Sequence, residues 1–169
     1  MKDVENVQDL FEIGLRYAYD CEQQLTKALP KMAQAASSSQ LRNAFEQHLE
    51  ETRRHAQRLE QVFQDLGVEA DTETNDVAKN LIKEGDNMIT HLDKSPLLDA
   101  ALIIAGNQVE HYEMAVYGSL RTWAELLGRT QSARLLQETL TEEKAADQKL
   151  TQIGETSVNR EALNVHAHA

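Results

Sequence analysis

The sequence contains few of the residues that break helices or cross-link a chain. Its 169 residues include one cysteine, two prolines and seven glycines, and aromatic residues make up 5% of the total. The single cysteine, Cys21, excludes an internal disulfide. Because glycine and proline disfavour helices, whereas the abundant Ala, Leu, Gln and Glu favour them, the composition predicts an all-α protein. The length is typical of one domain with a sizeable core.

Basic residues and long apolar runs are also scarce. The chain has 17 Lys and Arg against 28 Asp and Glu, a net charge of −11. Nucleic-acid binding depends on clustered cations, so this balance argues against direct contact with nucleic acid. The longest apolar run, around residues 100–105, is too short to span a membrane, and the beginning MKDVENVQDL lacks a signal-peptide pattern. We therefore expect a cytoplasmic protein with no membrane partner.

The spacing of the apolar residues predicts four long amphipathic helices and one shorter helix. The first long helix is expected to run from about residue 4 or 7 to about residue 36, and the other three at about 41–66, 96–127 and 130–153. The shorter helix is expected at about 76–92. Ser95 followed by Pro96 is a typical helix start. Pro30 is expected to kink or divide the first helix. Glycine at positions 67, 128 and 154 predicts three helix ends.

Two helical hairpins joined by a crossover at residues 68–95 are the arrangement that these elements predict. We expect the bundle to occupy residues 1–157 and a tail to occupy residues 158–169. The tail has little apolar content, so its His166 and His168 are not expected to belong to a site.

Each long helix carries acidic residues or histidine near the middle of its apolar stripe. The sequence distance from Glu22 to Glu51 nearly equals the distance from Glu113 to Glu143. A second candidate follows four residues after each of the later positions. The full set is Glu22 in the first helix, His48, Glu51 and His55 in the second, Glu110 and Glu113 in the third long helix, and Glu143 and Asp147 in the fourth.

Several carboxylates brought together inside a bundle cannot all stay ionised without a cation. Oxygen-rich ligand sets with one or two imidazoles suit iron or manganese. We therefore predict a centre for two iron or manganese ions, with His48 either a ligand or a neighbour of the ligands. The bland alternative is a metal-free bundle whose acids are protonated, bridged by water or extended to solvent. The predicted ligands are Glu22, Glu51, His55, Glu110, Glu113, Glu143 and Asp147.

The segments YDCEQQLTKALPKM, HLEETRRHAQRLE, EHYEMAVYGSL and TLTEEKAADQKL resemble the YciF-like family of bacterial stress-associated proteins. That family is a branch of the ferritin-like superfamily near rubrerythrin, and the resemblance covers nearly the whole chain. It implies a ferritin-like four-helix bundle with an extra crossover helix, a homodimer and a di-metal centre usually taken as iron. It implies no established reaction.

The chain departs from the wider superfamily at two helices. Ferritins and rubrerythrins pair a Glu with a His three positions later, whereas here Glu51 is followed at that distance by Arg54 and Glu143 by Ala146. The Glu110 and Glu113 pair resembles the two-acid helix of rubrerythrin. The resemblance therefore implies a centre richer in carboxylates and poorer in imidazole. With one cysteine, the chain lacks rubrerythrin's cysteine-ligated iron module, so redox turnover would need an external electron donor.

Three functions stay open at this point. The first is a di-iron or di-manganese oxidoreductase that acts on peroxide or oxygen during stress. The second is iron binding or metal handling without turnover. The third is a metal-free helical protein with a stress or interaction role. Metal content separates the third from the others, and turnover of an oxidant separates the first from the second.

Overall fold

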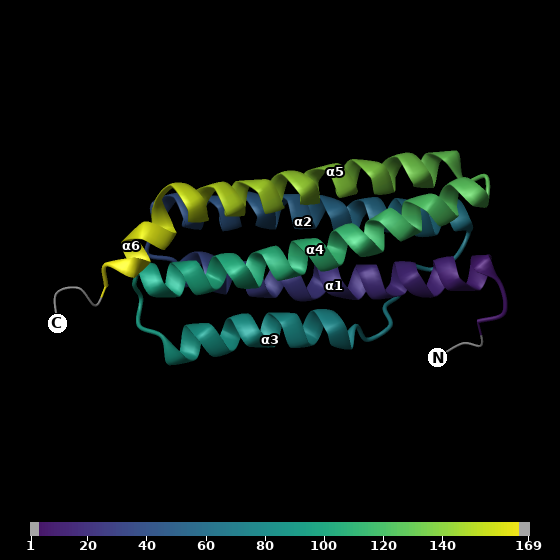
Figure 1. Cartoon of the computed structure of the whole chain (residues 1–169). Coiled ribbons are helices and arrows are strands. Elements are labelled where there is room, and N and C mark those ends of the chain that lie inside the picture. Colours follow the sequence, from purple (N-terminus) through teal and green to yellow (C-terminus); the bar gives the residue numbers. More distant parts are fainter. Residues whose placement is uncertain (1–3, 166–169) are drawn as a thin grey trace.

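The chain folds as a long bundle of helices (Figure 1). The computed structural model describes residues 4–165, and within this range the regular elements are all helical. This confirms the predicted all-α class. The elements are α1 (Val7–Ala35), α2 (Ser39–Leu66), α3 (Asp76–His91), α4 (Pro96–Leu126), α5 (Thr130–Ile153), a π-helical turn (Gly154–Val158) and α6 (Asn159–Leu163).

The helix boundaries follow local chemistry at most of the predicted positions. The side chains of Ser38 and Ser95 accept hydrogen bonds from backbone N–H groups in the first turns of α2 and α4. Pro96 occupies the first turn of α4, where its missing N–H costs nothing. Gly67 ends α2 with a left-handed φ of 74°, a conformation that glycine adopts without strain.

The four long helices form the bundle, and α3 is the crossover. α1 packs against α2 and α4, while α5 packs against α4 and α2. α3 lies outside the four, alongside α4 and α1, as Figure 1 shows. The predicted pair of hairpins with a helical crossover is therefore confirmed.

Two predictions about helix breaks were wrong in part. Pro30 does not divide α1, which continues to Ala35; Pro30 is exposed, while Leu29 and Ala33 beside it remain packed in the core. The α-helical part of α5 ends at Ile153 before Gly154, as predicted, but the φ of Gly154 is right-handed at −59° and the chain continues as a π-helical turn into α6.

Packing on α4 explains the continuation past Gly154. The glycine lies against Ile103, and Val158 is fully buried in the core. α6 also contacts α4. The division of the chain at residue 157 stays a prediction, and His166 and His168 lie outside the described residues.

The core consists of two apolar clusters with a polar layer between them. One cluster lies towards α3 and includes Leu29, Leu41 and Leu102. The other lies towards the opposite end of the bundle and includes Phe11 and Phe63. Buried acidic and imidazole side chains fill the layer between the clusters, at mid-length of the helices. Among the described residues, no helix has both the length and the apolar content that a membrane crossing requires.

Candidate metal centre

The four long helices each contribute buried polar side chains to the middle layer. α1 and α5 supply one carboxylate each, α4 supplies two, and α2 supplies two imidazoles. Each of these side chains belongs to a residue that is at most 6% exposed. The residues are Glu22 (α1), His48 and His55 (α2), Glu110 and Glu113 (α4) and Glu143 (α5).

Their ligand atoms form two adjoining groups. His48, Glu110, Glu113 and Glu143 make the first group, and Glu22, His55 and Glu143 make the second. Within each group the ligand atoms lie within 4.8 Å of one another.

Glu143 belongs to both groups. Its Oε2 lies 3.8 Å from His48 Nε2, and its Oε1 lies 2.9 Å from His55 Nδ1. A carboxylate in this position can bridge two cations, as in the carboxylate-bridged di-metal sites of helical bundles.

Many of the side-chain atoms in the two ligand groups lack a hydrogen bond. Although ring nitrogens and carboxylate oxygens approach closely here, several of these contacts lack the angles that a hydrogen bond requires. Buried polar atoms in proteins are normally paired, so such a concentration needs an explanation. Among the described residues, the unpaired buried side-chain atoms belong to Arg121 and to seven residues of this layer: Glu22, His48, Thr52, His55, Glu110, Glu113 and Glu143.

Without a cation the centre favours bound protons. Burial, reinforced by neighbouring carboxylates, raises the pKa of Glu143 and of Glu113 well above the usual value. Burial also raises the pKa of Glu22, against the opposing effect of His55. Burial alone would lower the pKa of His48, but the surrounding carboxylates of Glu110, Glu51 and Glu143 together outweigh burial and raise that pKa. A bound cation would take the place of these protons.

His55 is oriented by a carboxylate on its outer side. Its Nε2 hydrogen-bonds Glu142 Oε2 at 2.8 Å, and Arg58 binds the same carboxylate at 2.6 and 3.0 Å. These contacts hold the pKa of Glu142 well below its usual value, and the hydrogen bond with His55 has the largest effect. An ionised Glu142 accepts a hydrogen bond from the N–H group at Nε2. The lone pair of His55 is then on Nδ1, which faces Glu22 and Glu143.

His48 has a similar but looser arrangement. Its Nε2 lies 3.1 Å from Glu110 Oε1, inside the centre. Its Nδ1 lies 3.6 Å from Glu51 Oε2, on the solvent side. The contact with His48 lowers the pKa of Glu51, so that carboxylate stays ionised at neutral pH.

Six of the eight predicted residues converge, and two do not. Glu51 reaches only the rim, with a side chain 17% exposed, because the buried face of α2 steps from His48 to Thr52 to His55. Asp147 lies at the edge of α5, where its carboxylate accepts a hydrogen bond from Asn107 and lies 3.2 Å from His111. Neither Glu51 nor Asp147 belongs to a ligand group.

Three further residues of the centre were not in the predicted set. Thr52, three positions before His55, is fully buried on the inner face of α2. Glu142 reads as an ordinary surface acid in the sequence, and only its contact with His55 reveals its place. Tyr117 donates a short hydrogen bond to Glu22; its position four residues after Glu113 on α4 is the signal that could have indicated it.

Comparisons with known proteins give the chain its family. The family model described as "Domain of unknown function (DUF892)" matches residues 6–163. The chain belongs to the DUF892 family. Protein YciF of Escherichia coli (strain K12) is 43% identical to it over 163 residues, which cover 96% of this chain and 98% of YciF. The YciF-like resemblance of the sequence is therefore confirmed.

Solved structures of similar proteins share the DUF892 fold of this chain. The E. coli stress protein YciF superposes with a TM-score of 0.88 at 42% identity, covering 92% of this chain and 99% of YciF. YcfI of Rhodopseudomonas palustris, for which a structural role has been suggested, superposes with a TM-score of 0.85 at 44% identity. The match covers 89% of this chain and 96% of YcfI. A protein of Xanthomonas campestris, at 21% identity and a TM-score of 0.75, shows the shared fold alone.

Proposed function

We propose that this chain is a metal protein whose bundle core holds two ions, with iron or manganese as the expected metals. The observation that carries the proposal is the pair of ligand groups joined by Glu143, in a layer where many of the buried polar atoms lack hydrogen bonds within the described part of the chain. A protein stabilised only by its own contacts would leave few such atoms. Carboxylate oxygens with two imidazoles form the donor set that iron and manganese accept.

Each residue of the layer then has a definite task. One ion would be held by His48, Glu110 and Glu113, and the other by Glu22 and His55. Glu143 would contribute to both sites. When bound, a pair of redox-active ions supplies electron transfer to an oxidant such as peroxide or oxygen. Glu142 keeps the Nδ1 lone pair of His55 directed inward, and Tyr117 holds Glu22 by donating its hydroxyl proton.

Oxidant or metal chemistry in a stress response is the biological role we propose. The E. coli relative YciF is described as a stress protein. Cys21 does not offer an internal reductant, because burial, with Glu113 beside it, raises the pKa of its thiol well above the usual value. The electrons for repeated turnover would therefore come from an external donor. We extend the proposal to a homodimer in the cytoplasm. Light scattering of the purified protein tests the dimeric state.

A metal-free role is the second candidate, and one observation favours it. The raised pKa values of Glu113 and Glu143 let both side chains stay neutral inside the bundle. A bundle with protonated acids can fold without a cation, and a structural role has been suggested for the relative YcfI.

Elemental analysis of tag-free protein, purified without chelators, decides between the two. We expect about two iron or manganese ions per chain in the wild type and none in Glu143→Gln, which keeps the shape but removes the shared charge. Glu50→Gln is the matched control, because Glu50 is exposed and contacts Arg53 only at the surface. Folded wild-type protein that stays free of metal, even after incubation with Fe²⁺ or Mn²⁺, contradicts the metal proposal and supports the metal-free role.

A further inference from the structure

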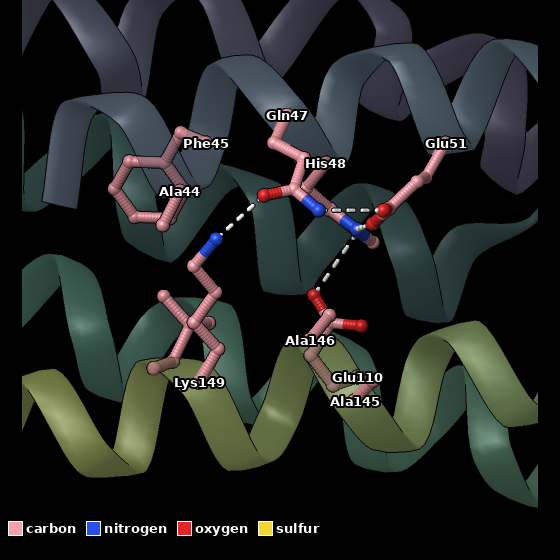
Figure 2. A pocket seen from close by; sticks show the side chains of 10 residues that line it. Ala44, Phe45, Gln47, His48, Glu51, Glu110, Ala145, Ala146 and Lys149 are labelled. Carbon is pink, nitrogen blue, oxygen red and sulfur yellow. Dashed lines mark hydrogen bonds and ion pairs between the residues drawn. The ribbon is translucent and has the colours of Figure 1, made fainter. Parts of the chain in front are cut away.

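A pocket of about 80 Å³ between α2 and α5 reaches the candidate metal centre (Figure 2). Two buried candidate ligands, His48 and Glu110, line its inner part. Alanines at positions 44, 145 and 146 form part of its walls and leave the space open. The volume is sufficient for several water molecules, and therefore for a partly hydrated ion.

Three polar side chains from the two helices meet at the solvent side of this pocket. Lys149 reaches from α5 and donates a hydrogen bond to Gln47 Oε1 at 2.5 Å, and Gln47 Nε2 donates to Glu51 Oε1 at 3.0 Å, as Figure 2 shows. The second oxygen of Glu51 lies 3.6 Å from His48 Nδ1. Glu51 is therefore positioned between solvent and the centre.

We propose that this pocket is the loading site for the divalent cations of the centre, with the Glu51 carboxylate as their first protein ligand. The inference rests on the metal centre proposed above. It gives Glu51 a task that the ligand groups do not, since Glu51 belongs to neither of them. It also explains why α5 carries alanine at 145 and 146, where longer side chains would fill the route.

The order of carboxylates along the pocket supports a stepwise transfer. Glu51 is half-buried at the outer end, and Glu110 is buried at the inner end. His48 lies between them: its Nδ1 faces Glu51, and its Nε2 lies 3.1 Å from Glu110 Oε1. Divalent cations lose their water more readily when carboxylate oxygens replace it one after another, and this pocket offers such replacements from the rim to the centre.

A second shallow groove near the centre is less suited to cations. It lies beside Glu142 and is lined by Arg58 and Arg134. Arg58 already binds both oxygens of Glu142, so this carboxylate is occupied by a guanidinium. Both carboxylates of this groove, Glu138 and Glu142, are paired with arginine, whereas Glu51 Oε2 faces His48.

Lys149 gives the proposal a second, opposite test. Its ammonium group adds a positive charge at the rim and holds Gln47, which in turn occupies an oxygen of Glu51. Removing the ammonium group in Lys149→Gln should therefore speed loading, while Glu51→Gln should slow it. A general loss of packing would not change the two rates in opposite directions.

The experiment measures Co²⁺ uptake by the metal-free full-length protein, followed by visible absorption after rapid mixing. Electrostatic steering of ligands typically changes association rates by a factor of about 10 or more, so we expect Glu51→Gln to load on the order of tenfold more slowly at low salt. The difference should shrink as ionic strength rises. Elemental analysis after loading should give the same final Co²⁺ content for Glu51→Gln as for the wild type. Glu50→Gln, which removes an equal charge from the outer face of α2, should load at nearly the wild-type rate.

The outcomes separate this inference from the proposed function. If Glu51→Gln loads as fast as Glu50→Gln while both reach the full Co²⁺ content, the loading site is refuted and the metal centre stands. If Glu51→Gln loses one equivalent of bound Co²⁺ at equilibrium, Glu51 is a resident ligand, and the inference is likewise overturned. Wild-type protein that binds no Co²⁺ overturns both the inference and the proposed function.

Discussion

Two buried carboxylates, Asp99 and Glu143, have opposite surroundings. Asp99, 1% exposed, accepts hydrogen bonds from the backbone N–H groups of Ser37 and Ser38 and from the Ser37 hydroxyl. Glu143, 0% exposed, has no hydrogen bond to either carboxylate oxygen within the described part of the chain. Asp99 joins α4 to the connection between α1 and α2, so its burial is explained by structure. The burial of Glu143 has no such explanation within the described residues, and the proposed cation would supply one. The donors around a buried acid, rather than its burial, distinguish a structural carboxylate from a ligand.

Loss of Asp99 should have the largest effect on stability. Asp99→Ala removes the acceptor of three hydrogen bonds, two of them to backbone groups at the start of α2, and we expect the free energy of unfolding to fall by about 2–3 kcal/mol. Urea unfolding measures this change. Asp93→Ala, at an exposed acid near the same helix start, is the control and should change stability little. Metal content should be unchanged in Asp99→Ala; a parallel loss of metal would contradict the division between the two carboxylates.

Loss of the outer support of His55 should weaken metal binding without unfolding the protein. Glu142→Gln replaces the negatively charged acceptor of the Nε2 hydrogen bond with a neutral amide. Removal of such partners typically weakens metal binding by about 10- to 100-fold. Competition with a chelator measures the affinity. Glu138→Gln is a close control, because Glu138 also lies near Arg58 but does not contact His55. Equal affinities in the two variants would show that Glu142 has no role in orienting the imidazole.

Glu143→Gln should stabilise the metal-free protein, which is the opposite of the Asp99 result. Because burial raises the pKa of Glu143, the folded protein keeps a proton on this group at neutral pH that the unfolded chain releases, and this difference costs stability. The cost begins above the unfolded pKa of about 4.3 and grows until the folded pKa is passed. We expect a gain of about 1 kcal/mol at pH 7 that disappears below about pH 4. Urea unfolding at both pH values checks it, and a variant less stable than wild type at pH 7 would show that Glu143 has adequate partners.

The smallest effect is expected from a pair of buried threonines. Thr52 Oγ1 has no hydrogen bond within the described residues, whereas Thr139 Oγ1 accepts one from Arg58. Thr52→Val should leave the stability of the metal-free protein unchanged or raise it slightly, since no hydrogen bond is lost. Thr139→Val should lower it by about 1 kcal/mol. Thermal unfolding of the two variants side by side tests whether the unpaired hydroxyl behaves as the structure indicates.

The sequence predicts the bundle and most of its centre because both depend on helical periodicity. Glu22, Glu113 and Glu143 interrupt apolar stripes, and a helix of this length has one buried face on which such residues converge. The same periodicity places Thr52 on the buried stripe of α2, four residues after His48 and three before His55. Glu51 was predicted as a ligand because of its carboxylate and its spacing from Glu22, although it lies one residue off that stripe.

Other features depend on contacts between helices that sequence spacing does not encode. Glu142 is half-exposed and next to Glu143, and it becomes part of the centre only because His55 of another helix reaches it. Gly154 is a typical helix end by composition, but packing against Ile103 on α4 lets the chain continue as a helix. Tertiary contacts decide both cases.

The apolar clusters on either side of the polar layer separate folding from ion binding. Leu41 and Leu102 on one side, and Phe11 and Phe63 on the other, hold the four helices together without any contribution from an ion. The candidate ligands are therefore held in place by the bundle itself, and if the centre binds metal as proposed, a chelator should remove the metal without unfolding the protein. A rigid site adjusts little to the ion that it binds, so the ionic radius and preferred geometry of the metal would decide which ions stay bound.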